Sequence, residues 1–248
     1  PAIDIRVLGK ASLSAKTPAR LPGTVKKIAV IGGGAAGLSV AWQLWMKGHE
    51  PVIIEGRKKL GGKITDSIPQ SRIPADVVEH EINRLAKSIR KMQLGKPLTK
   101  ERFLKLKQEN DYLVIATGAV KPRKLNVPGM EKALTALEFL QQSKLDCVTV
   151  GQKVVIIGAG NVGCDAATEA FRLGAQSVTL IDIQPPASFG IEREHAEAAG
   201  AKFLWPRFTK AVTDEGVELT DGELLPAETV IVAVGDMPDL SFLPDEIR

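Results

Sequence analysis

Residues 28–38 of this 248-residue chain read IAVIGGGAAGL, a short apolar strand that runs directly into a glycine loop matching GxGxxG. The spacing of the glycines has a mechanical cause, because each glycine plays a different part. Gly32 makes the tight turn, Gly34 lets backbone N–H groups approach a pyrophosphate, and Gly37 lets the following helix pack closely on the strand. Ala36 lies in the same loop, and the stretch predicts a site for the phosphates of a dinucleotide.

An acidic residue closes the strand that follows this loop. Glu55 is the last residue of PVIIE, 23 residues after Gly32, where a carboxylate can accept hydrogen bonds from both hydroxyls of a nucleotide ribose. A GxGxxG alone is weak evidence, because glycines can serve turns and packing only. The order of strand, glycine loop, helix over residues 36–47 and second strand predicts the opening of a doubly wound α/β nucleotide-binding domain.

The same pattern returns about 126 residues later, as VVIIGAGNVG at residues 154–163. Gly158 and Gly160 repeat the first two glycines, a helix follows to about Leu173, and Asp182 ends the next strand, SVTLID. If the glycines served only turns and packing, the glycine spacing and the acidic strand end would both have to occur twice by chance. The sequence therefore predicts two copies of one nucleotide-binding unit, which means two bound nucleotides or one site and one relic.

Weaker signals organise the rest of the chain. Residues 75–92 and 99–109 have helical patterns, and DYLVIATG at 111–118 predicts a buried strand that ends at a turn of small residues. Short strands alternate with turn signals at 214–216 and 221–222 before TVIVAVG, which predicts a small antiparallel insert ahead of the final parallel strand.

Composition excludes several classes of protein. No apolar run approaches the roughly 18–20 residues that span a bilayer, so no membrane span is expected. Three scattered histidines lack metal-ligand spacing, and seven Phe, three Trp and one Tyr are few for a nucleic-acid stacking platform. We therefore assign no metal site and no nucleic-acid partner. With two cysteines in the chain, a reducing cytoplasm is the expected location.

The small net charge of +4 is unevenly distributed. Residues 84–107, here called the basic segment, carry nine basic side chains and one acidic one, a net charge of +8. Such a segment can be a solvated surface, or it can be a docking surface for an acidic partner.

Thiol chemistry is disfavoured. Disulfide reductases with two nucleotide domains need a cysteine pair that accepts electrons from the flavin. Gly61 and Gly62 are followed by KITDS without a cysteine, and Cys147 and Cys164 lie 17 residues apart, outside any CxxC. Cys164 is expected to be a small buried hydrophobic residue on the helix of the second loop.

At a larger scale the chain resembles a known family. IAVIGGGAAGLSVAWQL, IIEGRKKLGGK and IPQSRIPADVVEHEI are similar to the flavin domain of the glutamate synthase small subunit family, and also to the flavin/NADPH module of dihydropyrimidine dehydrogenase. The similarity continues through DYLVIATGA, NVPGM, ALEFL, VVIIGAGNVGCDAA and VIVAVGDMPD, and covers about residues 25–240. It implies two Rossmann-like dinucleotide-binding domains, the second inserted in the first, with FAD in the first and a pyridine nucleotide in the second.

The resemblance also implies a division of the chain. The expected segments are a connecting arm at 1–23, an FAD-binding domain at 24–120, an inter-domain connection at 121–150, an NAD-binding domain at 151–240 and the start of a return to the FAD domain at 241–248.

Two departures from the family affect the first domain. Only QLG separates Met92 from the next helix, so we expect the first sheet to be one strand short. The chain stops at Arg248, where the family continues with a returning segment that bears a Gly-Asp pair, so we expect part of the FAD site to be missing. Gly235 and Asp236 look like that pair, but their setting matches the exit of the second domain.

Residue by residue, the resemblance assigns both cofactor sites. FAD is expected to contact glycines at its pyrophosphate, a carboxylate at its ribose, a loop and an arginine at its flavin, and the turn that closes the domain. In that order, the residues are Gly32, Gly34 and Gly37; Glu55; Gly62 and Lys63 of the loop with Arg72; and Thr117 and Gly118. The nicotinamide dinucleotide is expected on its phosphate loop and near its nicotinamide end, at Gly158, Gly160, Asn161, Val162 and Gly235. Taken alone, Arg72 could also be a surface cation.

The implied function is that of an electron-transfer oxidoreductase module. NADH reduces bound FAD by hydride transfer, and electrons pass to an iron–sulfur centre in another domain or subunit of a larger complex. The hydride step needs no acid–base side chain, so no catalytic residue is assigned. The alternative is a non-catalytic nucleotide-binding or scaffolding subunit of such a complex.

The donor is expected to be NADH rather than NADPH, because of the residues at the end of one strand. Users of NADPH carry adjacent basic residues after this strand, whereas here Asp182 is followed by no cation until Arg193. The Asp182 carboxylate can accept hydrogen bonds from a ribose diol and would repel a 2′-phosphate. Alternatively, Asp182 only caps the following loop.

Overall fold

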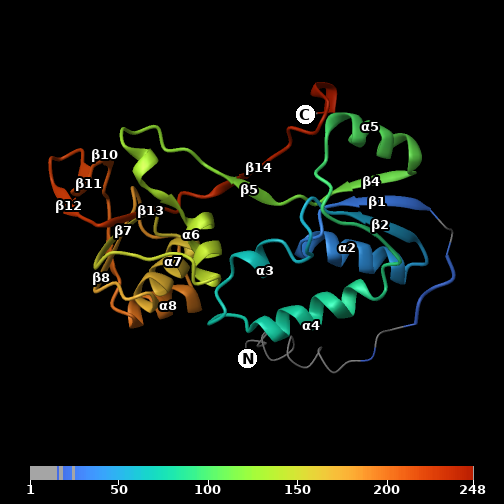
Figure 1. Cartoon of the computed structure of the whole chain (residues 1–248), viewed down its shortest axis with the longest axis horizontal. Coiled ribbons are helices and arrows are strands. Elements are labelled where there is room, and N and C mark those ends of the chain that lie inside the picture. Colours follow the sequence, from blue (N-terminus) through green and yellow to red (C-terminus); the bar gives the residue numbers. More distant parts are fainter. Residues whose placement is uncertain (1–15, 17–18, 24–25, 248) are drawn as a thin grey trace. The chain divides into compact units, whose positions relative to one another are not determined.

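The computed structural model describes residues 16, 19–23 and 26–247, which form two compact units (Figure 1). The first unit contains the chain up to Thr65, Pro74–Gly118, and the part from Asp239 onward; the second contains Asp66–Ile73 and Ala119–Pro238. The second unit is therefore inserted in the first. Residues 66–73, which fall inside the expected FAD domain, group with the second unit instead.

Most of the predicted connecting arm lies outside the described residues. At its described end, the Arg20 guanidinium donates hydrogen bonds to the carbonyls of Trp45, Gly48 and His49, at 3.0–3.1 Å. These contacts attach residues 19–23 to the turn after the helix Ala35–Met46.

Helices cover both faces of a parallel sheet in the first unit. Its described strands run in the order β3 (Lys91–Gln93), β2 (Glu50–Ile54), β1 (Lys27–Ile31) and β4 (Tyr112–Ile115). The helices are α2 (Ala35–Met46), the short α3 (Lys63–Asp66), α4 (Ala75–Ala86) and α5 (Lys100–Glu109). Alternate residues of β1 enter different cores: Ile28 and Val30 pack with α2, whereas Ala29 and Ile31 pack with α5 residues. This is the doubly wound arrangement that the sequence predicted.

The expectation that the first sheet lacks a strand is wrong. The helix expected over 75–92 ends at Ala86, and β3 pairs in parallel with β2, with Met92 opposite Ile53. The strand was missed because it is short and lies at the sheet edge, so all three of its side chains are exposed and show no apolar alternation.

The expectation of a buried strand at DYLVIATG is also wrong. The strand exists as β4, but it is the other edge of the described sheet, and Tyr112 and Ile115 are 59% and 42% exposed. An apolar run is typical of a strand covered on both faces, and the sequence alone does not reveal whether a neighbouring strand and helix complete that cover.

The second unit repeats the parallel sheet with different layers. Its described order is β6 (Leu134–Thr135), β13 (Thr229–Val232), β7 (Lys153–Ile157), β8 (Ser177–Ile181) and β9 (Lys202–Leu204). One face packs on α6 (Ala136–Lys144), α7 (Asn161–Arg172) and α8 (Ile191–Ala198). The other face packs on an antiparallel sheet of β10 (Thr209–Val212), β11 (Gly216–Leu219) and β12 (Leu224–Pro226). The predicted antiparallel insert is confirmed.

The chain enters and leaves the second unit through paired strands. β5 (Ala119–Pro122) and β14 (Asp236–Pro238) are antiparallel, with Asp236 opposite Pro122. Gly235 and Asp236 therefore lie at the exit of the second unit. Two short 3-10 helices, η1 (Met130–Lys132) and η2 (Asp245–Ile247), complete the described elements.

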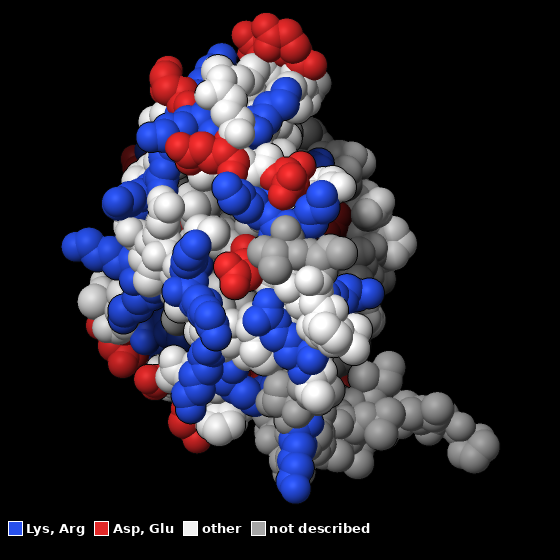
Figure 2. Space-filling model, turned by 90° about the vertical axis from the view of Figure 1, so that its right-hand side faces the viewer, with Lys and Arg blue, Asp and Glu red and all other residues white. Residues whose placement is uncertain are grey.

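Basic side chains gather on the first unit. Figure 2 faces this side of the chain and shows more Lys and Arg than Asp and Glu on the surface. Exposed members of the basic segment are Lys87, Arg90, Lys91, Lys96, Lys100, Lys105 and Lys107. Two of them make only loose ion pairs, Lys100 with Asp245 at 3.6 Å and Lys105 with Glu109 at 3.8 Å.

Candidate dinucleotide-binding sites

The first glycine loop needs glycine at its outer positions and leaves space at the middle one. Gly32 has a φ of +110°, and a Cβ there would collide with the Ala116 carbonyl. A Cβ on Gly37 would collide with the carbonyl of Gly32 itself. A Cβ on Gly34, by contrast, would meet nothing closer than the Gly62 Cα at 3.9 Å. The loop is therefore tightly packed against the protein and open where a ligand would approach.

The second loop has the same construction. Gly158 also has a φ of +110°, and a Cβ there would be 2.5 Å from the Ala233 carbonyl. A Cβ on Gly163 would collide with the carbonyl of Gly158, whereas a Cβ on Gly160 would meet no atom within 4 Å. The repeat seen in the sequence is thus a repeat of packing as well.

The acidic strand ends are held in the same way in both units. One Glu55 carboxylate oxygen accepts a hydrogen bond from the Gly33 N–H at 2.6 Å, and the other accepts from Arg57 N–H at 2.8 Å. Asp182 accepts from the N–H groups of Ala159 at 2.8 Å and Gln184 at 3.3 Å. A carboxylate has about four acceptor sites, so each retains capacity for ribose hydroxyls. Asp182 also caps its own loop, so both interpretations of this residue have a structural basis.

Two helix N-termini face these loops, and neither helix has an acidic residue in its first turn. Gly34 and Gly160 are the N-caps of α2 and α7, and neither helix has a side-chain cap. Ala36 and Val162 are exposed at these N-termini, and the Asn161 side-chain oxygen accepts from the Phe189 N–H at 3.0 Å. The free N–H groups and the helix dipoles suit the pyrophosphate of a dinucleotide.

The remaining first-unit residues lie around the first loop. The Gly61 N–H donates to the Gly33 carbonyl at 2.8 Å, which brings Gly62 over Gly34, and Lys63 begins α3 directly afterwards. The Thr117 backbone packs beside Gly32, and Gly118 follows with a φ of +67°. The structure thus brings together every first-unit residue that the resemblance assigned to FAD.

Arg72 is placed differently. It belongs to the second unit, where its guanidinium makes ion pairs with Asp165 of α7 at 2.9 Å and Glu192 of α8 at 2.6 Å. Burial raises the pKa of Asp165 to about 6, against the opposing effect of Arg72. Neither carboxylate could be predicted as a partner of Arg72 from the sequence, because an ion pair between distant elements leaves no local signal. A flavin contact for Arg72 stays a prediction.

A pocket of about 710 Å³ lies over the second glycine loop, a size typical of ligand sites. Gly158, Gly160 and Asp182 line it, as predicted for the second site. It also contains cations that the sequence analysis did not find, namely Arg123, Lys124 and Arg207. Gly235 lies beside it, because its carbonyl accepts from the Arg123 N–H at 3.0 Å.

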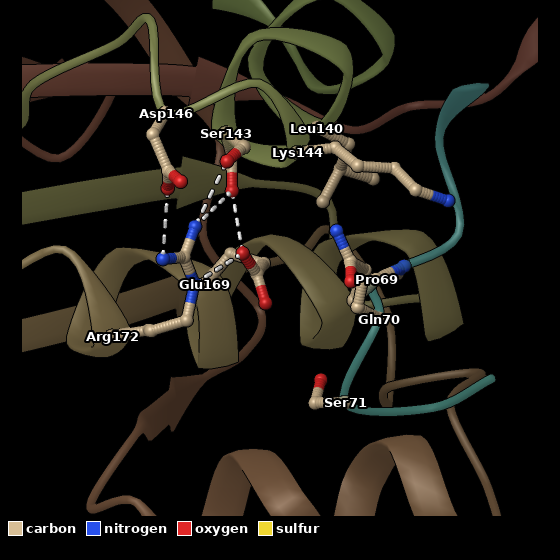
Figure 3. A pocket seen from close by; sticks show the side chains of 9 residues that line it. All are labelled: Pro69, Gln70, Ser71, Leu140, Ser143, Lys144, Asp146, Glu169 and Arg172. Atoms are coloured by element: carbon tan, nitrogen blue, oxygen red, sulfur yellow. Dashed lines mark hydrogen bonds and ion pairs between the residues drawn. The ribbon is translucent and has the colours of Figure 1, made fainter. Parts of the chain in front are cut away.

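A second cavity in this unit, about 250 Å³, is lined by residues 69–71 and by side chains of α6 and α7 (Figure 3). Its arginine is committed to protein partners. Arg172 donates to Glu169 at 2.8 Å, to Asp146 at 3.2 Å and to both oxygens of Ser143 at 2.9–3.1 Å. Because each nitrogen of Arg172 already has a partner in the protein, this arginine is not available to an anionic ligand. The network instead joins α6 to α7.

The structure supports the analysis of the cysteines. Cys164 is fully buried among the core residues of α7, and Cys147 is exposed and also unpaired. Among the described residues, no group of His, Cys, Asp and Glu has a metal-binding arrangement, and no helix has the length and apolarity to cross a membrane.

Two α/β units, the second inserted in the first, each have a glycine loop, an open middle glycine and an acidic strand end, which is the arrangement of a protein with two dinucleotide-binding folds. The family described as "Pyridine nucleotide-disulphide oxidoreductase" matches residues 26–247, and the chain belongs to this family. The fold predicted from the sequence is thereby confirmed.

Similar proteins bear out the resemblance seen in the sequence. The chain is 28% identical to the NADPH-Fe(3+) oxidoreductase subunit beta of Geobacter sulfurreducens, over 90% of this chain and 39% of that protein. It is 29% identical to the glutamate synthase [NADPH] small chain of Bacillus subtilis, over 84% and 48%. The chain thus spans less than half the length of these relatives. The solved thioredoxin reductase of T. acidophilum has a TM-score of 0.67 at 20% identity, over 88% of this chain and 80% of that one.

Proposed function

We propose that the chain is the flavin- and nicotinamide-binding module of an electron-transfer oxidoreductase. The observation that supports this most is the duplicated site: both middle glycines, Gly34 and Gly160, leave the space that a pyrophosphate needs, and both sites have a carboxylate at the ribose position.

The first unit would hold FAD through Gly32, Gly34, Gly37, Glu55 and the loop at Gly62. When bound, a flavin can accept a hydride from a reduced nicotinamide and release electrons singly. The residues of this chain would contribute alignment and electrostatic complementarity, with the N-terminus of α2 toward the phosphates and Glu55 toward the ribose.

We propose further that electrons leave for an iron–sulfur centre in a partner subunit of a cytoplasmic complex. Both curated relatives are named as subunits of larger enzymes, which supports a subunit role for this chain. The alternative is a non-catalytic nucleotide-binding or scaffolding subunit. The glycine geometry gives no support to a scaffold, because a scaffold needs no open space at the middle glycines, whereas a non-catalytic nucleotide-binding subunit would share this geometry and differ in failing to reduce its flavin.

NADH is proposed as the preferred donor. Both relatives are named for NADPH, so this proposal depends on Asp182 alone. A hydrogen bond to a charged group contributes roughly 1.5–3 kcal/mol, so a ribose diol on this carboxylate favours NADH by about tenfold or more.

A matched pair of substitutions tests the module. Gly34 and Gly160 have φ values of −77° and −79°, which alanine adopts without strain, so Gly34→Ala and Gly160→Ala add a methyl only to the open space. We expect Gly34→Ala to lose the absorbance of bound FAD. Gly160→Ala is expected to keep it and to slow reduction of the flavin by NADH. A wild-type protein that stays colourless after incubation with FAD would favour the scaffold.

A further inference from the structure

The strand end that bears Asp182 has a cation directly beside it. Arg207 follows β9, the strand that pairs with β8, and its backbone N–H donates to the Asp182 carbonyl at 2.8 Å. Both residues line the 710 Å³ pocket. Since β8 and β9 are adjacent parallel strands, their carboxyl ends meet at one side of the second glycine loop, where an acidic residue holds a nucleotide ribose.

The guanidinium of Arg207 is incompletely hydrogen-bonded. One terminal nitrogen donates to the Pro206 carbonyl at 3.0 Å. The Nε–H is buried and has no hydrogen-bond partner among the described residues. This nitrogen makes only a loose ion pair with Glu223, at 3.7 Å, which is beyond a hydrogen bond. Arginine N–H groups that are buried without an acceptor are costly, so this arrangement favours an anionic ligand.

Other arginines of this unit differ in that respect. Arg172 has each of its nitrogens in a hydrogen bond, and Arg72 has both terminal nitrogens in ion pairs. Arg193, the next cation after Asp182 along the chain, makes an ion pair with Glu197 at 2.7 Å and lies over the Phe203 ring. Arg207 differs from these three in its buried Nε–H, which has no hydrogen-bond partner among the described residues, and in its longer ion pair, at 3.7 Å to Glu223.

Position separates Arg207 from the other cations of the pocket. Arg123 is hydrogen-bonded to Gly235, which follows β13, and β7 lies between β13 and β8 in the sheet. Arg123 and Lys124 are therefore on the β13 side of the loop, whereas Arg207 and Asp182 are on the β8–β9 side. An anion that contacted Arg207 would therefore lie next to a ribose held by Asp182.

We propose that Arg207 is a specificity-determining residue that receives the 2′-phosphate of a nicotinamide dinucleotide. Asp182 and Arg207 then act in opposite directions: Asp182 favours the free ribose diol, and Arg207 offsets its repulsion of a phosphate. On this proposal the chain accepts both NADH and NADPH. Asp182 shifts the preference toward NADH, and Arg207 shifts it toward NADPH. This inference rests on the proposed function, because it concerns the same pocket.

A pair of probes that differ only in one phosphate tests the inference. Calorimetric titration of the FAD-loaded protein with 5′-AMP and with 2′,5′-ADP measures the effect of the 2′-phosphate, and bound FAD excludes the probes from the first site. We expect Arg207→Leu to lower the affinity for 2′,5′-ADP by about tenfold or more and to change the affinity for 5′-AMP by less than about twofold. Arg207→Lys, which keeps the charge, should recover part of the loss.

Arg123→Leu is the matched control, because it removes the same charge from the same pocket on the β13 side. This substitution should change the affinities for 5′-AMP and for 2′,5′-ADP by the same factor. If 2′,5′-ADP and 5′-AMP bind with the same ratio in wild type and Arg207→Leu, the role of Arg207 is refuted while the proposed function stands. If neither probe binds the wild type, the proposed function itself fails. Should Arg207→Leu not fold, Arg207→Gln gives the same comparison with a polar side chain.

Discussion

Neutralising Asp165 should stabilise the second unit at neutral pH, although this carboxylate makes an ion pair. Asp165 lies on α7 with 11% of its side chain exposed, and faces Arg72 at 2.9 Å together with the carboxylates of Glu192 and Glu169. Burial and the two like charges outweigh Arg72, so the pKa of Asp165 rises from 3.8 to about 6.

The magnitude follows from that difference. A pKa about two units above the ordinary value corresponds to about 3 kcal/mol between the charged and neutral forms at a pH above both values. Because the folded chain holds this proton more tightly than the unfolded chain, the free energy of unfolding rises as the pH falls through about 6, and levels off below about 4.

Asp165→Asn mimics the neutral form. We expect it to increase the stability of the second unit at pH 7.5 by up to about 3 kcal/mol, and to remove the pH dependence between about 4 and 7 that wild type shows. Arg72→Gln should instead destabilise the unit by about 3–5 kcal/mol, because it leaves the buried Asp165 and the partly buried Glu192 without their cation.

Urea-dependent hydrogen exchange of α7 peptides at several pH values gives the local free energy of unfolding. Asp146→Asn is the control: Asp146 also pairs with an arginine, but its side chain is 78% exposed, so it should change stability by less than about 1 kcal/mol. A loss of stability in Asp165→Asn at pH 7.5, or a pH dependence equal to that of wild type, would refute the reasoning.

Three further outcomes are expected. Gly37→Ala and Gly163→Ala each direct a methyl into a carbonyl, so each should destabilise its own unit by at least about 2 kcal/mol in urea denaturation; wild-type stability in either would contradict the packing described for the loops. Asp182→Ala should reduce the preference for NADH over NADPH in stopped-flow reduction of the flavin, and equal or faster reduction of the wild type by NADPH would contradict the role of Asp182. If the basic segment docks an acidic electron-transfer partner, transfer should slow as salt rises and in Lys100→Glu combined with Lys105→Glu, whereas a rate indifferent to both leaves only a solvated surface.

The sequence by itself was sufficient for the two glycine loops and their acidic strand ends. These features are local: the turn at Gly32, the close packing at Gly37 and the hydrogen bond from Gly33 to Glu55 depend on backbone geometry within one strand–loop–helix–strand unit. Because the unit occurs twice with the same spacing, the sequence also predicted two such domains. Their insertion, one in the other, was implied by the family resemblance and agrees with the two units of the structure.

Only the tertiary structure decided the sheet edges and the charges around the second site. β3 has exposed side chains and forms because β2 offers it a hydrogen-bonding edge, which no periodicity in Lys91–Gln93 indicates. Arg72 meets Asp165 across 93 residues, and Arg207 meets Asp182 because β8 and β9 are neighbours in the sheet. Such contacts depend on which strands and helices become adjacent when the core closes, and adjacency at that range has no counterpart in the spacing of residues along the chain.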